Sequence, residues 1–177
     1  MKLFKRLSPI WFAVILIWIK TVIVSFIGFN LHPENWTDIL FMILSPIGAI
    51  MVILGINIYF KRKVKPAAIF ATMVILTGIL FGDLLYYRFY TDFVTVPILF
   101  QFKNVGGIGP STLELISPWD LLLFADLAVF WLFYIKRKSG HEQITAKSKR
   151  VYTAVSVLFI FMTIILGMVK VPHLFSE

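Results

Sequence analysis

Charged and phenolic side chains interrupt the apolar run from Ile79 to Phe93, and these side chains could do chemistry inside a membrane. They are Asp83, Tyr86, Tyr87, Arg88, Tyr90 and Asp92. A charge in hydrocarbon costs at least about 2.5–3.5 kcal/mol on insertion scales, so it needs a partner, a water-filled cavity or a function. A guanidinium suits the phosphate of a lipid head group because it can donate two parallel hydrogen bonds to it.

The composition around this run is that of a membrane protein. The chain has 177 residues, of which 59% are hydrophobic, and its mean hydropathy is +0.89, whereas soluble domains are about 45–50% apolar. We therefore expect an all-α, polytopic membrane protein. The sequence has no cysteine, which excludes disulfides, thiolate metal ligands and a thiol nucleophile.

Five apolar segments are expected to cross the membrane and to form a single transmembrane domain over residues 1–177. The expected spans cover about residues 9–29, 38–60, 66–90, 118–135 and 151–170. The link from Phe93 to Ser117 contains an apolar piece that is too short to span, since a spanning helix needs about 20 residues. This piece predicts an interfacial or re-entrant segment between the third and fourth spans, followed by a glycine hinge.

The basic residues indicate the orientation. The net charge of +8 arises mostly from lysines and arginines before the first span, after the second and after the fourth. By the positive-inside rule these ends lie in the cytoplasm, so the amino terminus is expected to be cytoplasmic and the carboxyl terminus extracellular. Because the orientation in the membrane explains the positions of the basic residues, no nucleic-acid partner is expected.

Three buried charges are expected to lie at one depth in the outer half of the membrane. At the helical rise of about 1.5 Å per residue, Lys20, Asp83 and Asp126 each lie roughly 10–13 Å below the outer ends of their spans. Because these charges share one depth, Lys20 is the candidate partner of Asp83. Arg88 and Asp92 are four residues apart, which is close enough to pair on one helix.

These charges leave three interpretations open. In the first, a buried network fixes the packing of the helices and Lys20 extends towards the interface. In the second, an outward-opening cavity receives a lipid head group, with Lys20 and Arg88 facing its phosphate and the tyrosines lining its glycerol and acyl groups. The third is a pathway for an ion or a proton.

The motifs in and around this run resemble those of the lipoteichoic acid synthase family. The stretch from Tyr86 to Phe93 is similar to the family's tyrosine-arginine-aromatic-x-Asp-Phe run. Further similar motifs, in chain order, are Lys20-Thr21, Asn104-Val105-Gly106, Trp119-Asp120 and Asp126. By this resemblance Lys20, Arg88, Asp92, Asp120 and Asp126 occupy motif positions. Asp83 departs from the pattern, because asparagine is expected there.

The resemblance implies five amino-terminal spans followed by an extracellular, sulfatase-like catalytic domain. In the family that domain uses a threonine nucleophile and manganese to take glycerol phosphate from phosphatidylglycerol, and it releases diacylglycerol. Nothing in the outer loops of this sequence supplies such a nucleophile or ligand set, so the catalytic domain is expected to be absent from this chain, and no catalytic residue, metal ligand or cofactor is assigned within it.

We therefore expect the membrane domain of a phosphoglycerol transferase in the cell membrane of a Gram-positive bacterium. Its expected partners are phosphatidylglycerol, the extracellular catalytic domain and other envelope-synthesis proteins. The residues expected to contact the lipid head group or substrate are Lys20, Asp83, Tyr86, Tyr87, Arg88, Tyr90, Asp92, Asp120 and Asp126. The alternative functions are a small transporter subunit and a membrane assembly partner, either of which would use the buried Lys/Asp cluster.

Overall fold

A computed structural model describes residues 8–33, 35–61, 64–90, 116–136 and 146–174. The described residues are helical throughout, apart from short turns and connections, and this confirms the predicted all-α class. The expected interfacial segment with its glycines at Gly106, Gly107 and Gly109 lies outside the described residues.

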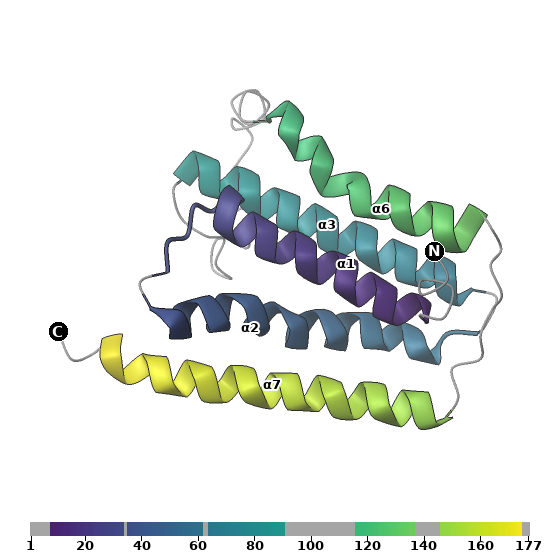
Figure 1. Cartoon of the computed structure of the whole chain (residues 1–177). Helices are drawn as coiled ribbons and strands as arrows, with labels where there is room; N and C mark the ends of the chain where they lie inside the picture. Colours follow the sequence, from purple (N-terminus) through teal and green to yellow (C-terminus); the bar gives the residue numbers. More distant parts are fainter. Residues whose placement is uncertain (1–7, 34, 62–63, 91–115, 137–145, 175–177) are drawn as a thin grey trace, which may run out of the picture.

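Five helical segments follow one another along the chain (Figure 1). Three are continuous or nearly so: α2 (Trp36–Gly55) extended by the 3-10 turn η2 (Ile56–Tyr59), α3 (Lys65–Tyr90) and α7 (Ala146–Leu174). The other two change helix type: α1 (Pro9–Ile23) ends in a π-helical turn η1 (Val24–Gly28), and α6 (Ala125–Phe130) lies between a 3-10 helix η4 (Pro118–Phe124) and a π-helical turn η5 (Trp131–Lys136).

Four of these segments are long and apolar enough to cross a bilayer. They are Pro9–Gly28, Trp36–Tyr59, Lys65–Arg88 and Ala146–Met168, and they correspond to the first, second, third and fifth expected spans. The chain is thus a multi-pass membrane protein. The expected fourth span is one helical segment, but it is not a continuous α-helix, because η4, α6 and η5 share its length.

The first helix lies at the centre of the bundle. Successive helices run in alternating directions, and α2 packs between α1 and α7, while α3 and α6 pack on the other side of α1 (Figure 1). In its most apolar stretch α1 buries 39% of its residues, against 11% for α7. A polar side chain on α1 therefore faces other helices more often than lipid.

The contact between α2 and α7 depends on a small residue. A Cβ atom added to Gly48 would come within 3.3 Å of the backbone nitrogen of Ile160 on α7. Nearer the start of α7, the hydroxyl of Tyr152 donates a hydrogen bond of 2.6 Å to the carbonyl of Met51. Small residues allow such close approach of helix backbones in membranes, where apolar burial against lipid gives little driving force.

We predict that Gly48→Leu separates α2 from α7 and destabilises the protein. The substitution places a large side chain against backbone that cannot move aside alone, and overpacking of this kind typically costs about 1–3 kcal/mol. The measurement is thermal unfolding in detergent. Gly78→Leu is the matched control, since a Cβ atom there meets nothing within 4 Å. Equal losses for the two variants would contradict this account of the interface.

Candidate functional site

Lys20 forms a buried ion pair with Asp126. Its ammonium lies 2.9 and 2.8 Å from the two carboxylate oxygens, and both side chains are only 8% exposed. It also donates to the hydroxyl of Thr77 and, over 3.2 Å, to the carbonyl of Leu123. An ammonium has three donors, and here the carboxylate, the hydroxyl and the carbonyl give each donor a partner.

The expected Lys20–Asp83 pair is wrong. Asp83 is half-buried, and the structure gives it no hydrogen bond or ion pair to another described residue. Counting residues gives the depth of Asp83 along α3, but it does not give the face of α3 that packs against Lys20. Asp83 follows Thr77 by six residues, which places it about 120° around the helix from the face of α3 that meets Lys20.

Arg88 forms a second ion pair, with Asp120 at the start of η4. Nη1 and Nη2 lie 2.7 and 2.8 Å from the two carboxylate oxygens, so the pair is bidentate. The backbone N–H of Ser117 also donates to this carboxylate over 2.8 Å, in a capping box that opens η4. Asp92, the partner expected from sequence spacing, lies outside the described residues. In the described part of the chain Arg88 is thus anchored across helices.

The irregular fourth segment suits these contacts. Pro118 lies in the first turn of η4, where a missing N–H is tolerated. The carbonyl of Leu123 accepts from Lys20 close to the change from 3-10 to α-helical geometry. Backbone carbonyls near such a change are more accessible to side-chain donors than those of a regular α-helix.

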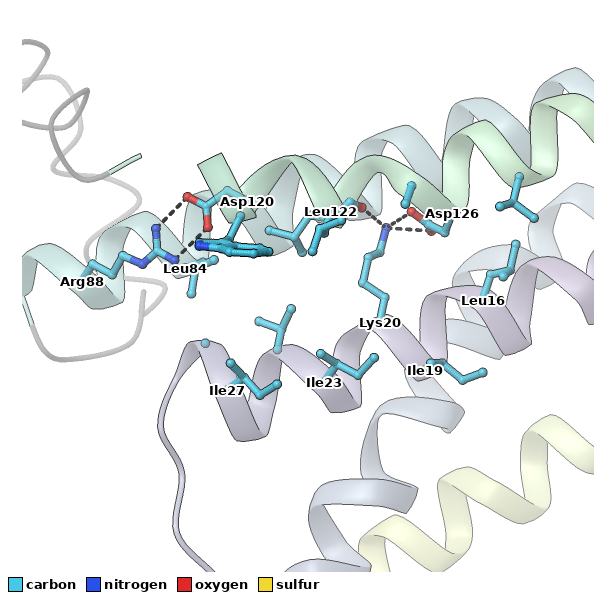
Figure 2. A pocket seen from close by; sticks show the side chains of 16 residues that line it. Leu16, Ile19, Lys20, Ile23, Ile27, Leu84, Arg88, Asp120, Leu122 and Asp126 are labelled. Carbon is cyan, nitrogen blue, oxygen red and sulfur yellow. Dashed lines mark hydrogen bonds and ion pairs between the residues drawn. The ribbon is translucent and has the colours of Figure 1, made fainter. Parts of the chain in front are cut away.

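Both ion pairs lie in the wall of one pocket of about 600 Å³ between α1, η1, α3, η4 and α6 (Figure 2). In the view of Figure 2, Lys20 reaches across from α1 to Asp126, and Arg88 meets Asp120 towards one end. The rest of the wall is mainly apolar. It consists of Leu16, Ile19, Ile23, Val24, Ile27, Gly28, Leu84, Trp119, Leu122, Leu123, Ala125 and Val129.

The structure brings together four of the nine residues expected at the site, namely Lys20, Arg88, Asp120 and Asp126. Asp83 and the half-buried Tyr86 and Tyr87 are not part of the pocket wall, and the ring of Tyr87 packs on that of Phe29 at 5.2 Å. The side chain of Tyr90 and the whole of Asp92 lie outside what the structure describes.

Thr77 is the participant that sequence reasoning missed. A threonine in an apolar helix attracts no notice because it can bond to its own backbone, as Thr77 does to the carbonyl of Met73 over 2.8 Å. Helical periodicity was the available signal. Leu84 and Arg88 follow Thr77 by seven and eleven residues, and these spacings place all three on one face of α3.

Metal binding has no support in the described ranges. Within them no three His, Cys, Asp or Glu side chains come together as candidate ligands. The two carboxylates of the site instead accept hydrogen bonds from cationic side chains. The arrangement therefore provides two neutralised ion pairs in an apolar wall, which suits an amphipathic ligand better than a metal ion.

The fold and site define a helical membrane domain with a pocket between its helices, bounded by two interhelical ion pairs. The chain belongs to the lipoteichoic acid synthase N-terminal domain family, whose model matches residues 1–177. It is 32% identical over 94% of its length to lipoteichoic acid synthase-like YvgJ of Bacillus subtilis, and 30% identical over 93% to lipoteichoic acid synthase 2 of the same organism. The synthase of Staphylococcus aureus is 27% identical over 93% of the chain.

This chain spans about a quarter of the length of these relatives, 27%, 26% and 26% respectively. No solved structure matches it. The comparisons confirm the family that the motifs indicated. They concern the membrane domain alone, because the similarity covers only that portion of each relative.

We predict that removing either partner of the Lys20–Asp126 pair is far more damaging than removing both. Lys20→Met or Asp126→Leu leaves one buried charge unpaired, which typically costs about 3–5 kcal/mol. The double variant removes both charges and should regain most of that loss. The measurement is a double-mutant cycle of unfolding free energies in detergent. Asp83→Asn is the control and should unfold like the wild type, whereas a loss as large as that of Lys20→Met would contradict the assignment.

Proposed function

We propose that this chain is the membrane domain of a lipoteichoic acid synthase-like phosphoglycerol transferase. It anchors the enzyme and contacts the head group of phosphatidylglycerol, or the glycerolphosphate polymer, at the outer leaflet. Family membership supports the first part of this proposal. We assign the transfer chemistry, with the manganese that the resemblance implies, to the portion of such enzymes that this chain does not cover.

The observation that carries the head-group proposal is the position of Arg88. It lies in the last turn of α3 (Lys65–Tyr90), and a spanning helix of this length would bring it close to the head-group region of a bilayer. Its side chain is 28% exposed, against 5% for its partner Asp120. The carboxylate thus holds the guanidinium from the buried side, and the guanidinium is the member of the pair that a ligand in the pocket can approach.

The distribution of charge supports the outer leaflet. The end of α2 and the start of α7 lie at the end of the bundle opposite the end of α3 (Figure 1). Lys61 follows η2, Lys149 lies in the first turn of α7, and Arg88 lies in the last turn of α3. By the positive-inside rule that basic end faces the cytoplasm. The end of the pocket beside Arg88, which we take as its mouth, would then lie in the outer leaflet, where a lipoteichoic acid polymer would be built.

We predict that Arg88→Gln abolishes a preference for phosphatidylglycerol over phosphatidylcholine with the same acyl chains. Both lipids carry a phosphate, but the choline ammonium offsets its charge in phosphatidylcholine, so the preference depends on attraction between the guanidinium and a net anionic head group, which a neutral amide does not supply. Arg88→Lys should restore only part of the preference, because an ammonium is a point charge without the planar fork. Native mass spectrometry of the purified chain with equimolar lipids measures the preference.

Lys61→Gln is the matched control, since it removes one exposed cation at the other end of the bundle. It should leave the preference unchanged. If Arg88→Gln retains the wild-type preference, the head-group proposal is wrong. Ion flux through liposomes containing the chain would instead favour a transporter subunit, and lipid-independent co-purification with a synthase would favour an assembly partner.

A further inference from the structure

The pocket is long as well as apolar. On the α1 side its wall runs from Leu16 to Gly28 along one face of the helix, a distance of about 18 Å at the helical rise of 1.5 Å per residue. One leaflet contributes about 15 Å to a hydrocarbon core of about 30 Å. The wall is therefore about as long as one leaflet is deep, and it runs from near the Arg88–Asp120 pair to beyond Lys20.

The size of the pocket limits the kind of ligand that it can hold. A volume of about 600 Å³ along about 18 Å gives a narrow, half-open channel between the helices. An α-helix with side chains is about 10–12 Å wide and would need well over twice this volume for the same length. The pocket thus has room for a single hydrocarbon chain along its length and too little to enclose a whole helix from a partner protein.

The walls offer the surface that such a chain requires. Ile19, Ile23 and Ile27 follow one another at four-residue spacing on α1, and all three are exposed. Leu122 and Val129 supply exposed apolar surface from the η4–α6 side. Branched aliphatic side chains on both sides match a hydrocarbon chain in polarity and gain dispersion contacts with it.

The buried ion pair adds no net charge to this apolar surface. Lys20 and Asp126 neutralise one another, and Lys20 donates in addition to Thr77 and Leu123. With 8% exposure, little of either charged group faces the channel. A hydrocarbon chain can pass this point without leaving an uncompensated charge beside it, so the full length of the pocket is available.

We propose that the pocket is a binding site for one acyl chain of a glycerophospholipid, which lies along α1 from the Arg88–Asp120 mouth to Leu16. The assignment of the lipid's phosphate to the mouth rests on the function proposed above, whereas the acyl site rests on the shape and polarity of the pocket. Holding one chain would fix the depth and orientation of the glycerol phosphate, because the head group is covalently joined to the held chain.

The experiment blocks the channel with a large side chain and compares lipids that have the same head group but different acyl-chain lengths. Native mass spectrometry in detergent is used to titrate the purified chain with phosphatidylglycerol that carries two sixteen-carbon or two eight-carbon chains. The wild type should favour the longer lipid. Ile23→Trp, which places a large side chain in the channel, should weaken binding of the longer lipid at least tenfold and abolish the preference for length.

Ile15→Trp is the matched control. Ile15 lies on the same helix with 40% exposure, against 51% for Ile23, but it is not part of the pocket wall. It should bind both lipids like the wild type. Val129→Trp fills the channel from the opposite wall and should reproduce the effect of Ile23→Trp, and thermal unfolding shows that each variant compared is folded.

Two results separate this inference from the proposed function. If folded Ile23→Trp and Val129→Trp bind the longer lipid like the wild type, the acyl site is refuted while the role of Arg88 stands. If Arg88→Gln keeps its head-group preference but the channel variants lose chain-length selection, the head-group assignment fails and the acyl site stands. An equal loss in Ile15→Trp would also refute the site, since the effect would not depend on the channel.

Discussion

The buried ammonium of Lys20 is the constraint on which the arrangement of this bundle depends. An isolated charge in the middle of an apolar helix destabilises the protein, and its free-energy cost falls only when a counter-charge and further acceptors surround it. The acceptors come from two other helices, Thr77 on α3 and Leu123 and Asp126 on the η4–α6 segment. One side chain thereby fixes the positions of α3 and of the η4–α6 segment relative to the central helix.

A second tie, between Arg88 and Asp120, holds the same segment to the last turn of α3. The segment from Pro118 to Phe130 is therefore fastened at two levels, and the apolar pocket lies along α1 beside both of them. We attribute the open pocket to these two ion pairs, which hold the segment at a fixed position beside α1. If the segment packed on α1 by apolar contacts alone, close packing of side chains would be expected to fill much of the space.

Much of this could be predicted from the sequence. Apolar length indicated the long helices, and the expense of buried charge singled out Lys20, Arg88 and Asp126 as residues that must meet something. The pairing was less predictable, because depth along a helix follows from counting residues, whereas direction depends on how each helix is rotated. Asp83 lies at a suitable depth but on another face of α3, and only the placement of the helices shows that Asp126 is the partner of Lys20.

The attachment of α7 has a mechanical consequence. It packs mainly on α2, with Tyr152 reaching Trp11 of α1 at a ring distance of 5.1 Å, far from the Arg88 end. Its later residues Phe161, Ile164 and Met168 are exposed. A sideways displacement of that half of α7 would act first on α2 near Gly48, whereas α3 and the η4–α6 segment, which carry the two ion pairs, have few or no contacts with α7.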